Sequence, residues 1–308
     1  MSKKHTPDIS VVIPLYNGET FIAECLESVF AQTDQPMEVI VVDDGSTDKS
    51  VEIVKNFEKN ITVINQKNSD VSAARNAGVK AAHGELIAFL DQDDLWEPSK
   101  LEKQIALFMK EPDIDLVFTD LVKIGPSGKK RHPKDRDKIA RSLTDSNLFH
   151  KLAIKNVLMP SAVMVKKGSF VKAGLFDESF ATCGDYEMWL RMAGMNMKFR
   201  YVSDPLTVYR YHGANESKKT DIMNEDRIKA VEKVFDNPSL SESKKRFRNK
   251  SIARAYIEGA HAYYSRKNYK GFLDYAHKAL SLDKSSLGWK FMRRLVRAWA
   301  RTRVMGQG

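Results

Sequence analysis

Three carboxylates directly follow an apolar run within the first hundred residues. Residues 86–90 are all apolar, and Asp91, Asp93 and Asp94 come next with no lysine or arginine among them. Carboxylates this close repel one another unless a cation joins them, and a hard divalent ion takes oxygen ligands of this kind. A diphosphate would be the natural co-ligand of such an ion. For Asp94 an alternative stays open, because acids are also favoured in the first turn of a helix and an amphipathic segment follows.

The strands that carry these acids follow from the apolar pattern. A continuous apolar run without polar alternation is typical of a strand buried on both faces, as in a parallel sheet. Strands are expected at 9–13, 39–42, 61–64 and 85–90, with helical segments between them at 21–30, 48–54 and 69–82. This alternation implies right-handed βαβ units and a Rossmann-like, mostly parallel α/β sheet. Ligands of such sheets bind outside the carboxyl ends of the strands, where Asp43, Asp44 and Asp91 would share one crevice.

The usual phosphate-binding loops do not occur in the sequence. No Gly-x-Gly-x-x-Gly follows the first expected strand, and there is no Gly-Lys-Ser or Gly-Lys-Thr. Such glycine loops cradle dinucleotides and triphosphates through backbone N–H groups. Their absence disfavours a dehydrogenase or a nucleotidyltransferase. A nucleotide bound here would need a metal to neutralise its phosphates.

The pattern from residue 121 to 215 is less regular. Residues 123–141 are polar and rich in charge, with several glycines and prolines, and we expect a mobile loop over the site. Strands are expected at 161–165 and 198–211, with a helix at 185–193 between them. Asp185 would lie at or near the N-terminus of that helix, where a plain helix cap is the alternative to a catalytic role.

Charge separates the chain into a near-neutral body and a basic tail. Residues 241–308 carry 17 Lys/Arg against 4 Asp/Glu, whereas residues 1–240 carry 33 against 36. The two cysteines, Cys25 and Cys183, lie far apart, which argues against a disulfide scaffold or zinc site and suits a reducing compartment. No apolar stretch approaches 18 residues, so a cytoplasmic protein is expected, with peripheral attachment to the cytoplasmic membrane face left open.

The tail is expected to be helical and to end in an amphipathic helix at 286–304. Residues 220–285 have a helical pattern, including a single helical hairpin at 255–282. At 100° per residue, one arc of the last helix holds Trp289, Phe291, Met292, Leu295, Val296 and Trp299, and the opposite arc holds Lys290, Arg293, Arg294, Arg297 and Arg301. An apolar face with two tryptophans and a basic face without acids favour an anionic membrane surface. The alternative is a terminal helix docked on its own domain. Nucleic acid is disfavoured, because phosphate contacts alone would not require the apolar arc.

Six segments taken together resemble the family 2 glycosyltransferases, and they occur in the family's order over about residues 8 to 215. They are Ser10-Val-Val-Ile-Pro-Leu-Tyr-Asn17, Val42-Asp-Asp-Gly-Ser-Thr-Asp48, Ala74-Arg-Asn-Ala-Gly78, Phe89-Leu-Asp-Gln-Asp-Asp94, Gly184-Asp-Tyr-Glu-Met-Trp-Leu-Arg191 and Tyr209-Arg-Tyr-His212. The resemblance implies an inverting enzyme with the A-type glycosyltransferase fold, here followed by a C-terminal α-helical extension.

The resemblance also implies roles for individual residues. Asp185 matches the catalytic base, and Asp93 and His212 match positions that contact a Mn²⁺ or Mg²⁺ ion on the diphosphate. The nucleotide side would be formed by Pro14, Tyr16, Asp44, Arg75, Asp91 and Gln92, with Asp44 accepting a hydrogen bond from uracil N3–H. Many members have Glu-Asp where this chain has Gly184-Asp185. The second acid, which the base role requires, is retained.

The expected function is transfer of a sugar from a nucleotide-diphosphate donor, a UDP-sugar, to a hydroxyl of a glycan or lipid-linked acceptor. We expect a catalytic domain at 1–235, with a nucleotide-sugar-binding half at 8–120 and an acceptor-binding half at 121–215, and a basic helical tail at 236–308. Polysaccharide biosynthesis for the cell envelope is what the family suggests. The alternative is a non-catalytic nucleotide-sugar-binding or scaffold protein of the same fold.

Overall fold

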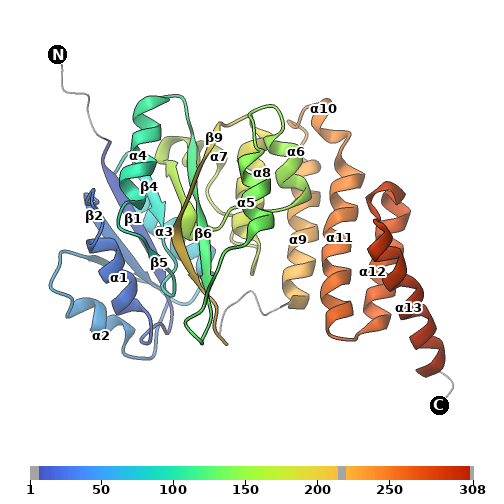
Figure 1. Ribbon diagram of the computed structural model, residues 1–308. Helices are drawn as coiled ribbons and strands as arrows, with labels where there is room; N and C mark the ends of the chain where they lie inside the picture. The colour runs from blue at the N-terminus through green and yellow to red at the C-terminus, as the bar shows by residue number, and fades with distance from the viewer. Residues whose placement is uncertain (1–6, 214–219, 306–308) are drawn as a thin grey trace.

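The computed structural model describes residues 7–213 and 220–305, in which an α/β part is followed by a row of helices (Figure 1). Within these residues nine strands form one mixed sheet in the order β3-β2-β1-β4-β8-β6-β9-β5, with β7 paired to β6. The strands are β1 (Ile9–Leu15), β2 (Glu38–Asp43), β3 (Thr62–Asn65), β4 (Leu86–Phe89), β5 (Leu95–Trp96), β6 (Leu116–Ile124), β7 (Lys130–Arg131), β8 (Val163–Lys166) and β9 (Phe199–Arg210).

The first four strands, in the order β3-β2-β1-β4, are parallel. The register pairs Pro14 with Val42 and Val12 with Phe89, so β1 lies between β2 and β4. All seven residues of β1 are buried. Alternate side chains enter different cores, Val12 on one face and Val11 and Ile13 on the other. The strands expected from apolar runs and the Rossmann-like α/β class are therefore confirmed.

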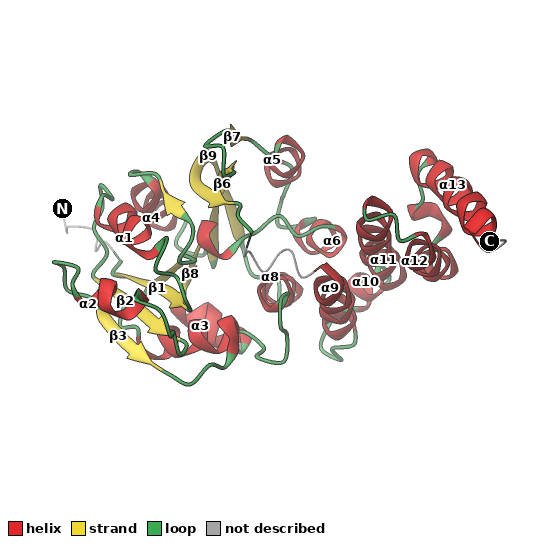
Figure 2. Ribbon diagram, turned by 90° about the horizontal axis from the view of Figure 1, so that it is seen from below, coloured by secondary structure: helices red, strands yellow, loops and turns green. Residues whose placement is uncertain are grey.

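Helices cover both faces of this sheet, as the view along it shows (Figure 2). One face packs on α1 (Ile22–Phe30), α2 (Ser50–Lys55) and α4 (Lys100–Lys110). The other packs on α3 (Asp70–Ala81), α6 (Leu148–Ile154), α7 (Lys167–Ala173) and α8 (Gly184–Gly194). This two-sided cover is what makes the purely apolar strands favourable.

The second half of the sheet mixes strand directions. β8 runs antiparallel to both β4 and β6, whereas β6 and β9 are parallel with an irregularity beside Asp120. The expected loop at 123–141 is wrong, because this segment contains β7 and helix α5 (Lys134–Arg141). The reason is tertiary. Arg136 donates to the fully buried carboxylate of Asp120 at 2.7 Å, and this pair fastens the segment to β6.

The helical extension is confirmed. It comprises α9 (Thr220–Phe235), α10 (Glu242–Lys245), α11 (Arg248–Ser265), α12 (Tyr269–Leu282) and α13 (Trp289–Met305), which follow α8 side by side. Ile252 and Ala255 of α11 join the core of the α/β part, whereas Phe272 and Ala276 of α12 belong to a separate core. None of the described helices combines the length and the apolarity needed to cross a membrane.

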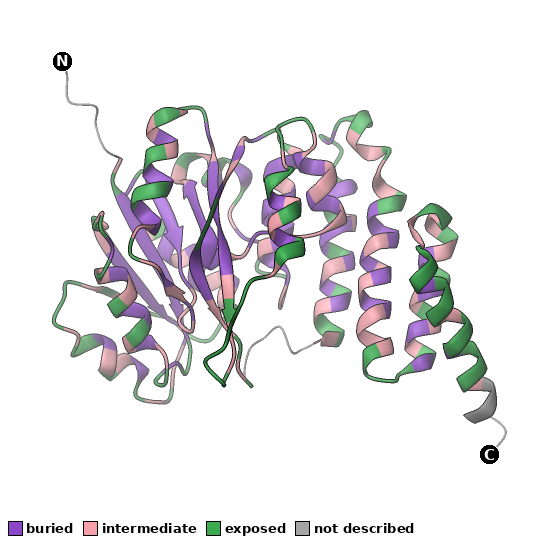
Figure 3. Cartoon of the chain, viewed as in Figure 1, coloured by how far each residue is buried: buried purple, intermediate pink, exposed green. Residues whose placement is uncertain are grey.

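Helix α13 divides its apolar residues between two sides. Phe291 and Ala298 are buried in the core shared with α12. Trp289, Val296 and Trp299 stay 76%, 65% and 50% exposed, as the green of this helix reflects (Figure 3). The helix is therefore docked on the chain and still presents an apolar stripe to solvent.

Candidate active site

The acids after β4 lie at the carboxyl edge of the parallel strands and are held in a turn. The N–H of Asp94 donates to the carbonyl of Asp91 at 3.0 Å, and the N–H of Asp91 donates to Ser161 Oγ at 3.1 Å. Asp91 Oδ1 lies 2.5 Å from Nη2 of the buried Arg75, which comes from α3. Two of the residues predicted at the nucleotide side are thus an ion pair at this edge.

The two predicted metal ligands are brought together from positions 119 residues apart. His212 Nε2 lies 2.8 Å from Asp93 Oδ2, and the imidazole stacks on Phe21 with ring centroids 4.6 Å apart. Burial and the neighbouring charge of Asp91 raise the pKa of Asp93, while the contact with His212 lowers it. The site is therefore rich in negative charge, which a bound cation would relieve.

Asp94 is a buried structural acid, and the helix-start interpretation is wrong. Helix α4 begins only at Lys100. The carboxylate of Asp94 is fully buried and accepts from Ser161 Oγ at 2.6 Å and from the N–H of Arg210 at 3.0 Å. Burial, with the nearby Asp93 and Asp91 charges, raises its pKa well above the usual range. Asp94 joins the acid turn to the segment before β8 and to the end of β9.

Gln92 holds the chain after β1 instead of facing the crevice with a free amide. Its Oε1 accepts from the N–H of Tyr16 at 2.8 Å, and its Nε2 donates to the carbonyl of Tyr16 at 3.0 Å. A Cβ on Gly18 would lie 2.6 Å from Gln92 Oε1, so this backbone-to-amide clamp leaves room for glycine alone. The side chain of Tyr16 itself remains 47% exposed at the same edge.

Asp44 presents one carboxylate oxygen after using the other. Its Oδ1 accepts from Gln66 Nε2 at 2.7 Å and from the N–H of Ser69 at 2.9 Å. No partner within the described residues is recorded for Oδ2, which leaves an acceptor for a ligand N–H. Pro14 lies in β1 one residue before Leu15, whose carbonyl accepts from the N–H of Asp44 at 2.8 Å.

The Ala74–Gly78 motif joins the nucleotide side of the site to the region of Asp185. A Cβ on Gly78 would lie 2.4 Å from Val12 Cγ1, so glycine lets α3 pack closely on β1. Asn76 donates to the carbonyl of Phe176 at 2.9 Å and accepts from its N–H at 3.0 Å. Sequence reasoning missed this role of Asn76, although the motif itself was the available signal.

Asp185 lies in the first turn of α8, next to the Arg75–Asp91 pair. Burial raises the pKa of its carboxyl to about 6; Arg75 and the backbone N–H of Tyr186 lower it, and Asp91 raises it. A carboxylate with a pKa just below neutrality is ionised at pH 7 and still basic enough to accept a proton. A Cβ on Gly184 would lie 2.7 Å from Ser72 Oγ, so the space where relatives carry an acid is narrow here.

A second acid cluster, absent from the sequence predictions, lies on β6 and the β7–α5 segment. Ligand atoms of Asp120, His132 and Asp137 lie within 4.8 Å of one another, as a metal site would require. These residues are not the predicted ligands Asp93 and His212. Arg136 already pairs with Asp120. The missed signal was an acid directly after the apolar residues 116–118, the same pattern as at Asp91.

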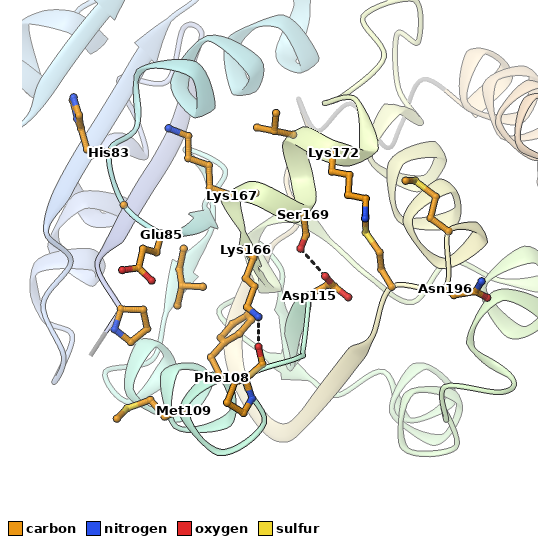
Figure 4. A pocket seen from close by; sticks show the side chains of 18 residues that line it. His83, Glu85, Phe108, Met109, Asp115, Lys166, Lys167, Ser169, Lys172 and Asn196 are labelled. Carbon is orange, nitrogen blue, oxygen red and sulfur yellow. Dashed lines mark hydrogen bonds between the residues drawn. The ribbon is translucent and has the colours of Figure 1, made fainter. Parts of the chain in front are cut away.

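A pocket of about 1120 Å³ lies at the other end of the sheet (Figure 4). It is lined by the start of β4 and by α7, including Lys166 and Lys167, whose amines donate to the carbonyls of Pro112 and Ala82. Among the described residues, no predicted site residue lines it. The pocket is thus separate from the acid crevice.

A family model described as glycosyl transferase family 2 matches residues 10–180, more than half of the chain. The chain belongs to glycosyltransferase family 2. An uncharacterized glycosyltransferase of Rickettsia typhi is 31% identical over 194 residues, 61% of this chain and 59% of that protein. Chondroitin synthase of Escherichia coli is 30% identical over 244 residues, 77% of this chain and 33% of that enzyme. This family 2 glycosyltransferase therefore spans less than two thirds of the length of these relatives.

Solved structures give this family 2 member its fold. S. aureus TarS 1–349 in complex with UDP-GlcNAc matches with a TM-score of 0.69 at 20% identity, over 91% of this chain and 82% of that chain. The mannosyltransferase PcManGT from Pyrobaculum calidifontis, in complex with GDP-Man and Mn²⁺, matches with a TM-score of 0.60 at 17% identity, over 97% and 87%. The A-type glycosyltransferase fold is thereby confirmed.

Proposed function

We propose that this family 2 member is an inverting glycosyltransferase that moves a sugar from a UDP-sugar to an acceptor hydroxyl, with Asp185 as general base. The observation that carries the proposal is the Asp185 carboxyl, its pKa raised to about 6, beside the Arg75–Asp91 pair at the acid crevice. A family member without catalysis would not need an acid kept partly out of water at this point.

The donor would lie across the carboxyl ends of β1, β2 and β4. Asp44 Oδ2 offers an acceptor of the kind that a uracil N3–H requires, and Pro14 and Tyr16 border it. Arg75 and Asp91 would lie beside the diphosphate and sugar, and the amide of Gln92 would hold Tyr16 in place. The UDP-GlcNAc complex of S. aureus TarS supports a UDP-sugar as the donor class.

A divalent ion fits the residues present next to the diphosphate position. Asp93 Oδ2 and His212 Nε2 lie together, and a carboxylate with an imidazole suits Mn²⁺, with Mg²⁺ as the harder alternative. When bound, such an ion supplies Lewis-acid stabilisation of the charge on the leaving diphosphate. The raised pKa of Asp93 supports this assignment, because the acid turn holds more negative charge than its own cations balance. The Mn²⁺ in the PcManGT complex supports it further.

Asp185 would remove the proton from the acceptor hydroxyl as its oxygen attacks the anomeric carbon. The attack comes from the face opposite the leaving group, so the configuration inverts and no covalent enzyme intermediate forms. Arg75 keeps positive charge near Asp185, which favours the ionised base at neutral pH. The sugar passes through an oxocarbenium-like state, as in glycoside hydrolysis.

The test is Asp185→Asn, with Asp274→Asn, an exposed acid of α12, as the matched control. We expect Asp185→Asn to retain UDP binding by calorimetry and to lose transfer from UDP-sugars to glycan acceptors by at least about 100-fold. The control should behave as the unmodified protein. Transfer at the unmodified rate in Asp185→Asn would refute the base role. UDP binding without transfer in the unmodified protein, over a panel of donors and acceptors, would favour the non-catalytic alternative.

The acceptor would be a glycan or lipid-linked glycan bound by residues 121–215, in polysaccharide biosynthesis at the cytoplasmic face of the cell envelope. The name chondroitin synthase supports a glycan acceptor for this family branch. The division into a catalytic domain at 1–235 and a basic tail at 236–308 accompanies this proposal. Its boundary coincides with the end of α9.

Helix α13 is proposed to contact an anionic membrane surface. Its exposed Trp289, Val296 and Trp299 are accompanied by basic residues and by no acid on the helix. We expect Trp289→Ser with Val296→Ser to lower flotation with phosphatidylglycerol vesicles, and Val171→Ser, an exposed apolar residue of α7, to leave it unchanged. Equal flotation of all forms, or of the unmodified protein with neutral vesicles, would refute this attachment.

A further inference from the structure

The two residues immediately before Gly184 and Asp185 are held by helix α9 of the extension. Oδ2 of the buried Asp226 accepts from the backbone N–H of Thr182 at 2.8 Å and from its Oγ1 at 2.9 Å. Cys183 Sγ donates to the carbonyl of Met223, also on α9, at 3.6 Å. Two consecutive residues next to the general base are therefore attached to a helix outside the matched family region, which ends at residue 180.

The opposite side of the same segment is held by α3. Asn76 bonds both backbone groups of Phe176, and its Nδ2 also donates to Glu178 Oε1 at 2.8 Å. Helix α3 carries Arg75, the partner of Asp91. The segment leading to Asp185 is thus held between the helix that carries the nucleotide-side arginine and the first helix of the extension.

The chemistry of Asp226 is more demanding than that of a packing residue. A buried carboxylate is costly unless hydrogen bonds compensate it, and a charged acceptor makes stronger hydrogen bonds than a neutral one. Both bonds of Oδ2 go to Thr182, two residues from Gly184. Nearby Asp221 on the same helix is exposed and pairs with Arg266 at 2.5 Å, away from this segment.

We propose that Asp226 is a positioning residue for catalysis, which fixes the start of α8 and thereby the place of Asp185 relative to the Arg75–Asp91 pair. The helical extension is then part of the support of the active site. This inference rests on the proposed role of Asp185 as general base.

The test compares Asp226→Ala and Thr182→Val with Asp221→Ala as the matched α9 control. A displacement of about 1 Å of a catalytic group can cost about 100-fold in rate. We therefore expect kcat to fall about 10- to 100-fold in Asp226→Ala and less in Thr182→Val, which keeps the backbone bond. The KM for the UDP-sugar and the Kd for UDP should stay within about twofold, and Asp221→Ala should match the unmodified enzyme. Asp226→Asn keeps an acceptor oxygen and should recover part of kcat.

Two results would overturn the inference. One is unmodified kcat in both Asp226→Ala and Thr182→Val; the other is a loss of UDP affinity as large as the loss of kcat. Thermal unfolding monitors folding, and Thr182→Val tests the contact if Asp226→Ala does not fold. Adding Asp226→Ala to Asp185→Asn should lower residual transfer no further, because the two residues act as a unit. Full transfer in Asp185→Asn alone would refute the proposed function, whereas an inactive Asp185→Asn beside an active Asp226→Ala refutes only this inference.

Discussion

Replacing Asp185 by asparagine should stabilise the protein while it removes transfer. The pKa of Asp185 is raised from 3.8 to about 6 in the folded chain, because burial disfavours the ionised form. Above the unfolded-state pKa the folded protein therefore bears a cost for ionising this carboxyl. The shift of about 2 units corresponds to about 3 kcal/mol at 1.36 kcal/mol per unit. Asparagine carries no charge at any pH and avoids this cost.

The sign of the effect sets its pH window. At pH below about 4 the carboxyl is protonated in both states, and Asp185→Asn should have almost no effect on the free energy of unfolding. The stabilisation should grow as the pH rises from 4 to 6 and stay at up to about 3 kcal/mol above that. For a chain of this length this corresponds to a rise in Tm of about 4 °C. The same ionisation predicts an acidic limb near pH 6 in the pH profile of kcat/KM.

The measurement is urea and thermal unfolding of both forms between pH 4 and pH 8, without nucleotide. Asp274→Asn provides the control, because its carboxylate is exposed and should give no such pH dependence. A difference in stability that is independent of pH, or an Asp185→Asn form less stable than the unmodified protein at pH 7, would refute the reasoning. A pH–rate profile that stays flat down to pH 5 would contradict it independently.

Three further predictions concern the contacts around the crevice. Gly78→Ala should lower the free energy of unfolding by about 1–3 kcal/mol in urea titrations, because its Cβ would lie 2.4 Å from Val12 Cγ1; an unchanged midpoint would contradict the close packing. Gln92→Ala should raise the KM for the UDP-sugar by about 3- to 10-fold by freeing the backbone of Tyr16, with kcat little changed; an equal loss in kcat would point to direct contact with the reacting groups. His212→Ala should raise the Mn²⁺ concentration needed for half-maximal activation at least about tenfold, and unchanged activation would remove His212 from the metal site.

The acids at strand ends could be predicted because their position depends on local pattern and on a general rule of topology. An apolar run that ends in Asp91 must place that acid where a buried parallel strand emerges, and Asp44 follows the same rule one strand away. The structure does place both at the carboxyl edge. Their roles toward donor and metal remain predictions, since these depend on a ligand.

Asp94 shows why neighbouring residues in sequence can differ in role. It shares the turn of Asp91 and Asp93, yet its partners, Ser161 and the backbone of Arg210, come from 67 and 116 residues away. Local propensity favours an acid at a helix start. Only the closure of β8 and β9 around the turn determines that this carboxylate is buried.

The sequence by itself determined the α/β class, the alternation of strands and helices, the edge at which the acids gather and the amphipathic character of 286–304. These depend on hydrophobic periodicity and on motif order, which are local. Tertiary structure alone decided that Gln92 clamps Tyr16, that α13 docks one apolar side while exposing the other, and that Asp226 holds the segment before Asp185. Each of these depends on which distant groups remain to satisfy a buried polar atom or cover an apolar face. The chain settles that choice only when its elements pack together.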